Sequence, residues 1–240
     1  MTTDNGQDYY IKKIPELMKK YNKVEVQLAE TLTSYFNNSK IQDLLVEIRK
    51  ACEALIPDLP YIGGDTNPTT QNLIDSACSL PILLSLEKEG ISMRDMAKII
   101  YKTFESFYNL TSPEKRQQIR DFYFSEDMCE ITRKASSVSQ LRKYPEDWVY
   151  TYVEGDGISF NYGYDIIECG IVKFYKQIGA ERFTPIICLT DYANFRSLGV
   201  GFKRIQKIST GDTICDFRFK KDFDTPSGWP PDDLEETFPF

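Results

Sequence analysis

The sequence has 240 residues, of which 41% are apolar and 27% charged, and its formal net charge is −7. These values are ordinary for a globular protein, exclude a largely disordered chain, and leave enough residues for a sizeable core. Lys and Arg are scattered along the chain. This acidic balance argues against a nucleic-acid partner, because such binders concentrate positive charge on one face.

The chain contains no histidine. This excludes Ser-His and Cys-His catalytic dyads within the chain, and every His-ligated metal site. Any acid–base chemistry therefore falls to Asp, Glu, Lys, Tyr, Cys or the substrate itself.

Six cysteines are widely spaced, with no CxxC pair: Cys52, Cys78, Cys129, Cys169, Cys188 and Cys215. The N-terminal residues lack the features of a signal peptide, and no window approaches 18 apolar residues. We therefore expect free thiols in a cytoplasmic protein that has no membrane partner.

Apolar residues recur at helical spacing in the first half of the chain. A stripe predicts a helix over residues 41–55, and Cys52 lies within it, which gives this thiol a core role. Residues 61–68 are rich in Gly, Asn and Pro and predict a loop. Further helices are expected over 69–89, from Ser92, and from Ser112-Pro113, where Ser caps the helix and Pro suits its first position.

The pattern changes near Tyr144-Pro145. Aromatic and β-branched residues over 148–164, interrupted by Gly-Asp-Gly, predict a hairpin. Two helices follow, over about 166–178 and 182–197, and then a second hairpin over 200–221. The first of these helices has an apolar stripe made of Ile167, Ile171, Phe174 and Ile178.

The order of elements therefore predicts an α+β protein. A helical region, residues 1–140, packs on an α+β region, residues 141–240, in one continuous globular unit. The second region contains a hairpin, two helices and a second hairpin in this order, which predicts an antiparallel sheet with both helices on one face.

Three cysteines of the second half are candidate catalytic groups. Cys169 falls in the first turn of the predicted 166–178 helix, opposite to its apolar stripe, where N–H groups and the helix dipole favour a thiolate. Cys188 shares a helical face with Asp191, a carboxylate able to orient or deprotonate a neighbour. Cys215 alternates with phenylalanines on an apolar strand face, a pattern typical of packing.

Five segments, in matching order and spacing over roughly residues 60–230, resemble the L-2-amino-thiazoline-4-carboxylic acid hydrolase family. They are residues 61–68, 163–174, 187–192, 199–204 and 211–219, of which Glu168-Cys169 and Cys215-Asp-Phe-Arg-Phe219 are the most specific. The resemblance implies a hydrolase that opens a cyclic amidine, converting 2-aminothiazoline-4-carboxylate to N-carbamoyl-cysteine. It also implies a shared site, since Cys169, Cys188 and Cys215 all lie in these segments.

Such a substrate sets the types of residue that its site needs. Its carboxylate requires a cation, and Arg204 or Arg218 could form a bidentate contact. A carboxylate near the amidinium would hold its charge and move a proton, for which Asp191, Glu168 and Asp216 are candidates.

The loop before the 69–89 helix is a further candidate for substrate binding. Gly63, Gly64 and Asn67 could offer backbone N–H groups to an anionic group, although an isolated Gly-Gly is more typical of an ordinary turn. We expect the pocket where this loop, the start of the 166–178 helix and the 213–219 strand approach one another.

Two mechanisms are compatible with these residues. In one, Cys169 attacks directly and forms a covalent adduct. In the other, Cys169, Cys188 and Cys215 with a carboxylate bind a soft metal such as zinc, which activates water. Their long, irregular spacing differs from compact zinc motifs, so we expect no metal and no cofactor.

Two other functions stay open alongside the hydrolase. One is a related biosynthetic enzyme that acts on a different heterocycle or amide, and the other is a small-molecule binding domain without turnover. All three have a small-molecule ligand as the partner. A homo-oligomer is also compatible with the sequence.

Overall fold

The computed structural model describes residues 3–224 and 228–231, which form eight α-helices and one four-stranded sheet. The helices are α1 (Thr3–Leu32), α2 (Asn38–Leu55), α3 (Thr70–Lys88), α4 (Met93–Asn109), α5 (Pro113–Tyr123), α6 (Glu126–Ser139), α7 (Gly170–Gln177) and α8 (Thr184–Leu198). The strands are β1 (Val149–Glu154), β2 (Tyr162–Glu168), β3 (Phe202–Lys203) and β4 (Cys215–Phe219). The α+β prediction is confirmed, with helices first and the sheet in the second half.

Local sequence explains where three helices of the first half begin. The side chains of Ser92, Ser112 and Ser125 each accept a hydrogen bond from the backbone N–H three residues further on, which caps α4, α5 and α6. The stripe predicted for α2 is buried as expected, and Cys52 is fully enclosed within it.

The two hairpins join into one antiparallel sheet with the strand order β1-β2-β4-β3. Tyr164 lies opposite Phe217, and Ile166 lies opposite Cys215. Because side chains alternate along a strand, these four residues share the inner face with Tyr150 of β1. The other face is polar and carries an ion pair between Asp165 and Arg218.

Helix α6 covers the outer edge of β1. The hydroxyl of Ser136 donates to the carbonyl of Tyr150 (3.0 Å) and accepts from the N–H of Tyr152 (2.9 Å). Ser139 bonds both backbone groups of Tyr150 (3.1 Å each). These hydroxyls take the place of a neighbouring strand, so backbone groups at the edge are satisfied and this wall of the molecule is fixed.

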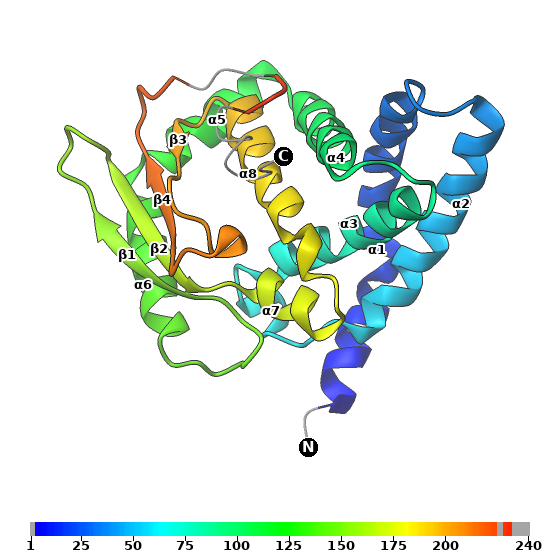
Figure 1. The fold of residues 1–240 in the computed structure, drawn as a ribbon. Helices are drawn as coiled ribbons and strands as arrows, with labels where there is room; N and C mark the ends of the chain where they lie inside the picture. The colour runs from blue at the N-terminus through cyan, green and yellow to red at the C-terminus, as the bar shows by residue number, and fades with distance from the viewer. Residues whose placement is uncertain (1–2, 225–227, 232–240) are drawn as a thin grey trace.

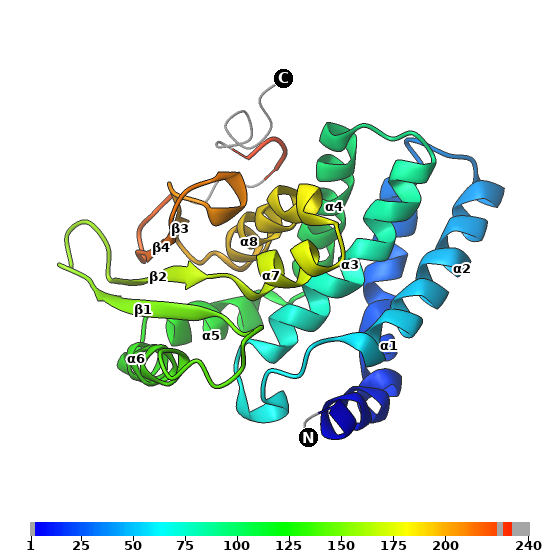
Figure 2. The ribbon, with the colours of Figure 1, turned by 60° about the horizontal axis from the view of Figure 1, so that its bottom comes forward.

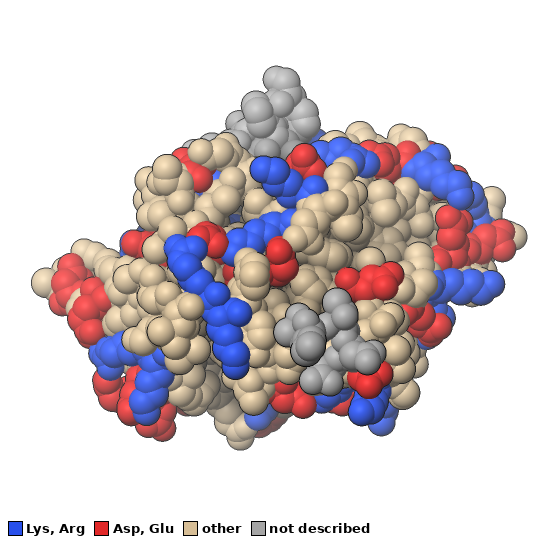
Figure 3. Space-filling view, turned by 90° about the horizontal axis from the view of Figure 1, so that it is seen from below, with Lys and Arg blue, Asp and Glu red and all other residues tan. Residues whose placement is uncertain are grey.

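The elements lie in successive layers. Figures 1 and 2 show α1–α4 grouped on one side and the sheet with α6 on the other, with α7 and α8 between them. Helix α8 packs closely along α4 and so joins the two regions. In the described part of the chain, no helix is both long and apolar enough to cross a membrane. Basic and acidic side chains are interspersed over the face shown in Figure 3.

The predicted start of the 166–178 helix was wrong. Strand β2 continues to Glu168, held by pairing to β1 and β4, and α7 begins only at Gly170. Two members of the predicted stripe are correspondingly outside the core, since Ile167 is 42% and Ile178 45% exposed. Cys169 is thus the residue between strand and helix, and not part of the first helical turn.

The second predicted hairpin is also shorter than expected. Its first strand contains only Phe202–Lys203. The N–H groups of Ile205 and Gln206 donate to the carboxylate of Asp216, and not to the backbone of a neighbouring strand. The chain then leaves the sheet and forms a loop over residues 204–214, which we call the 204–214 loop. This loop crosses the end of the inner face and contributes to the site.

Candidate functional site

A cavity of about 400 Å³ lies between the inner face of the sheet and α8. Its size is typical of small-molecule sites. Walls come from β1, β2 and β4 on one side, from α7 and α8 on another, and from α3, α5 and α6 on the rest. Most of the lining is apolar and aromatic.

The cavity brings together residues that are far apart in the sequence. Cys169 reaches it from the end of β2, Cys188 and Asp191 from α8, Cys215 from β4, and Arg204 from the start of the 204–214 loop. All four predicted catalytic residues and one predicted binding residue therefore line one space.

The charged centre of this space is the ion pair between Arg204 and Asp191. Nη1 of Arg204 lies 2.6 Å from Oδ2 of Asp191, and Nη2 donates to the carbonyl of Cys188 (2.9 Å). The guanidinium also lies over the rings of Tyr192 and Phe217. The Arg204 side chain is only 1% exposed, whereas Asp191 keeps 34% of its side chain accessible.

Burial acts on both members of this pair. It raises the pKa of Asp191, and the neighbouring Arg204 opposes that rise. For Arg204 burial alone would lower the pKa, but the charge of Asp191 raises it, so the guanidinium stays ionised. The arginine is thus a fixed charge beneath a carboxylate that faces the cavity.

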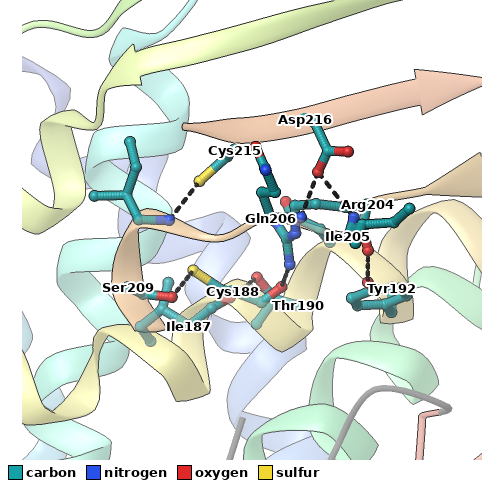
Figure 4. Close-up of polar contacts among 12 residues, drawn as sticks. Ile187, Cys188, Thr190, Tyr192, Arg204, Ile205, Gln206, Ser209, Cys215 and Asp216 are labelled. Atoms are coloured by element: carbon teal, nitrogen blue, oxygen red, sulfur yellow. Dashed lines mark hydrogen bonds and ion pairs between the residues drawn. The ribbon is translucent and has the colours of Figure 1, made fainter. Parts of the chain in front are cut away.

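The 204–214 loop holds two of the thiols. Figure 4 shows Cys188 on α8 and Cys215 on β4 on either side of this loop. The Cys188 thiol donates to Oγ of Ser209 (3.2 Å), and the N–H of Ile208 donates to the sulfur of Cys215 (3.2 Å). Consecutive residues of one loop therefore position both sulfur atoms.

The pKa values of the thiols differ from the sequence-based expectation. Burial raises the pKa of Cys169 to about 12, and the N–H groups of Ile171 and Val172 offset this only in part. The expected thiolate at Cys169 is therefore wrong. Burial also raises the pKa of Cys215 to about 12. Burial and the neighbouring Asp191 raise the pKa of Cys188 as well, but there Arg204, Ser209 and Lys207 oppose the rise.

These shifts predict slow alkylation of the three cavity thiols near neutral pH. Below its pKa a thiol gains thiolate about tenfold per pH unit, so the rates with iodoacetamide should climb throughout pH 7–9. Cys188 should react first, since three groups favour its thiolate. Mass spectrometry of quenched samples would measure each site, with a cysteine peptide as the control. An alkylation rate at Cys169 that does not increase with pH above pH 7 would contradict the raised pKa.

The close approach of Trp148 to α7 shapes the cavity next to Cys169. A Cβ atom at Gly170 would lie 2.6 Å from the indole ring, so only glycine fits at this position. Lys173 fixes the same corner by donating to the carbonyls of Pro145 and Asp147. Trp148 can therefore line the cavity beside the thiol.

The 61–68 loop reaches the cavity only through its last residue, Pro68, which lines it together with Thr69, and it does not present Gly63, Gly64 or Asn67 there. Asn67 ties the loop to the start of β1. Its amide donates to the carboxylate of Asp147, and its oxygen accepts from the N–H of Thr69 (2.9 Å). The role that the structure gives to Asn67 is to position this wall.

Two other predicted binding residues also lie outside the cavity lining. Glu168 pairs with Arg142 and Lys173, which lowers the pKa of its carboxyl group. Arg218 lies on the polar face of the sheet, 2.8 Å from Asp165.

Asp216, the third candidate carboxylate, accepts from the backbone of the 204–214 loop. It thus holds the loop, whereas Asp191 is the one candidate carboxylate of the three that lines the cavity.

Several residues at the site were not anticipated from the sequence. Ser209 does not line the cavity but contacts Cys188 from a predicted turn, and Asn194, which lines the cavity, follows Asp191 by one turn of α8. The aromatic residues Tyr150 and Tyr164 could have been found, because they alternate onto the same face as Cys215.

The three thiols do not form a metal-binding group in this arrangement. Across residues 3–224 and 228–231, no three His, Cys, Asp or Glu side chains are grouped so that they could hold a metal ion. Cys188 and Cys215 instead bond to neighbouring residues of the 204–214 loop.

Fold and cavity together define an α+β protein with a cavity of small-molecule size, in which thiols accompany a carboxylate–guanidinium pair. The family model described as L-2-amino-thiazoline-4-carboxylic acid hydrolase matches residues 71–219, and the chain belongs to this family. The matched region runs from α3 to β4 and contains Cys169, Cys188, Asp191, Arg204 and Cys215, but it begins after the 61–68 loop. Comparisons with curated proteins and with solved structures gave no match.

Proposed function

We propose that the protein hydrolyses a cyclic amidine of the thiazoline type and opens its ring, as the family description indicates for 2-amino-thiazoline-4-carboxylic acid. The observation that carries this proposal is the single cavity in which three thiols meet the Asp191–Arg204 pair. That all six cysteines are free supports a cytoplasmic site of action.

Asp191 is the proposed binding group for the amidinium. Its Oδ2 accepts from Arg204, so Oδ1 is left to accept from the N–H groups of the substrate. A planar cation bound there would place its central carbon near α8, where Cys188 lies one turn before Asp191. Arg204 keeps the carboxylate ionised and in place.

Cys188 is the proposed nucleophile. A cationic amidine bound at Asp191 would lower the pKa of this thiol further, because an adjacent positive charge favours the thiolate. The sulfur adds to the amidine carbon and the ring C–S bond breaks, with the departing sulfur taking up a proton. Water then adds to the isothiourea carbon and expels the Cys188 thiolate, which leaves a urea. Asp191 moves the protons.

The proposal is tested by incubating the purified protein with 2-aminothiazoline-4-carboxylate and with neutral derivatives of the same ring. Loss of the ring and gain of one water would be followed by mass spectrometry, and mass spectrometry of the quenched protein would detect the covalent adduct. We expect consumption of at least one cyclic amidine. Binding without consumption would instead identify a small-molecule binding domain. A parallel incubation with amides that lack the ring would identify the alternative enzyme if only those amides were consumed.

A further inference from the structure

The cavity extends well beyond the space that one five-membered ring needs. Its lining includes Cys215 of β4, Ile166 of β2 and Tyr150 of β1, and it continues to Ile131 and Ala135 of α6. Adjacent strands are about 4.8 Å apart, so the space beneath three strands extends for roughly 10 Å. A five-membered ring held at Asp191 and Cys188 would therefore leave the part beneath β1 and beside α6 empty.

The charges of the lining disfavour a free carboxylate. Its charged residues are Asp75, Asp191 and Arg204. Asp75 is paired with Lys20 (2.7 Å), and the guanidinium of Arg204 is 1% exposed with both terminal nitrogen atoms engaged. The residues outside the described ranges contain no Lys or Arg. A substrate carboxylate would thus be buried beside two acidic residues without a cation of its own, which is costly.

The far end of the cavity is suited to a neutral apolar group. Tyr150 and Tyr164 lie against each other there, with ring centroids 5.7 Å apart. The apolar side chains of α6, Met128, Ile131 and Ala135, complete this end. Apolar surface of this kind stabilises an aromatic or aliphatic ligand group by removing it from water.

Between the two ends, Asn194 offers a hydrogen-bond acceptor. It lines the cavity one turn beyond Asp191, and its Oδ1 is buried without a hydrogen-bond partner among the described residues. Buried polar atoms are normally satisfied, so a rotation of the side-chain amide that turns this oxygen into the cavity would let it accept from a ligand N–H group.

We infer that the substrate is a cyclic amidine whose ring carries a neutral apolar group through an amide, in place of a free carboxylate. The amidine lies at Asp191 and Cys188, the amide N–H donates to Asn194, and the apolar group lies between β1 and α6. This inference rests on the proposed function, which it makes more specific.

The test compares the free acid, 2-aminothiazoline-4-carboxylate, with its benzylamide on the wild-type protein. We expect kcat/KM to be at least about tenfold higher for the benzylamide, the effect of one satisfied buried hydrogen bond. Faster hydrolysis of the acid would overturn the inference and leave the proposed function standing. If neither compound is consumed, the proposed function fails, and calorimetric binding decides the inference by itself: tighter binding of the amide supports it, and equal or tighter binding of the acid overturns it.

A variant pair locates the apolar group. Ala135→Trp should fill the end of the cavity beside α6 and lower the ratio of amide to acid kcat/KM, whereas Ser137→Trp on the exposed side of the same helix should leave the ratio unchanged. An unchanged ratio in a folded Ala135→Trp protein would place the group elsewhere and overturn this part. If that variant does not fold, Ile131→Trp, which replaces a half-exposed lining residue, serves the same purpose.

Discussion

Replacing Cys188 by serine should abolish ring opening and leave the fold intact. The hydroxyl is far less nucleophilic at neutral pH than the thiol it replaces, and loss of a nucleophile costs on the order of 10⁴-fold or more in kcat. Serine is of similar size and can still bond to Ser209, so the thermal midpoint should change little. Turnover would be measured by mass spectrometry and stability by thermal unfolding of the same samples.

Cys169→Ser and Cys215→Ser are the matched controls, because both thiols line the same cavity with a pKa raised to about 12. In each control variant kcat should fall by roughly tenfold or less, as expected when a neutral contact is altered. If Cys169→Ser alone abolishes turnover, the nucleophile is the thiol before α7, as the sequence first indicated. Loss of activity in all three variants together with a bound metal would instead support the zinc mechanism.

Those parts of the fold that depend on local signals could be predicted from the sequence. Ser112-Pro113 begins α5 because capping and a fixed φ angle act within one turn of the chain. The stripe of α2 and the first hairpin follow from periodicity in the same way. The boundary between β2 and α7 could not be predicted from local signals. Pairing with β1 and β4 holds the end of β2 extended, and this pairing depends on residues far away in the sequence.

The composition of the site was predictable only in part. Alternation along β4 places Arg218 on the face opposite to Cys215, so the choice between Arg204 and Arg218 could have been made from the sequence. The pair of Arg204 with Asp191 could not, because it depends on how the 204–214 loop returns to α8. The pKa of Cys169 was misjudged for a related reason: the N–H groups in the first turn of α7 can be expected from the sequence, but the burial that outweighs them cannot.

Removing either charge of the Asp191–Arg204 pair should reduce both activity and stability. Asp191→Asn deprives the amidinium of its counter-ion and the reaction of its proton carrier, so kcat/KM should fall on the order of 10³-fold. It also leaves the guanidinium buried without a carboxylate, and breaking a buried pair in this way costs about 3–5 kcal/mol in the free energy of unfolding. Enzyme kinetics and urea unfolding would measure the two effects.

The double variant separates the two roles of this pair. Arg204→Met alone should also destabilise the protein, because it leaves the partly buried Asp191 carboxylate without its cation, and burial then raises the pKa of Asp191 further. Asp191→Asn with Arg204→Met removes both charges, so the free energy of unfolding should recover above that of either single variant while turnover stays lost.

The matched control is Arg218→Met, which breaks the pair with Asp165 on the polar face of the sheet. This variant should lose no more than about 1 kcal/mol in the free energy of unfolding, and it should retain activity. Additive losses in the double variant, or an inactive Arg218→Met protein, would show that the functional ion pair is not the one beneath the cavity.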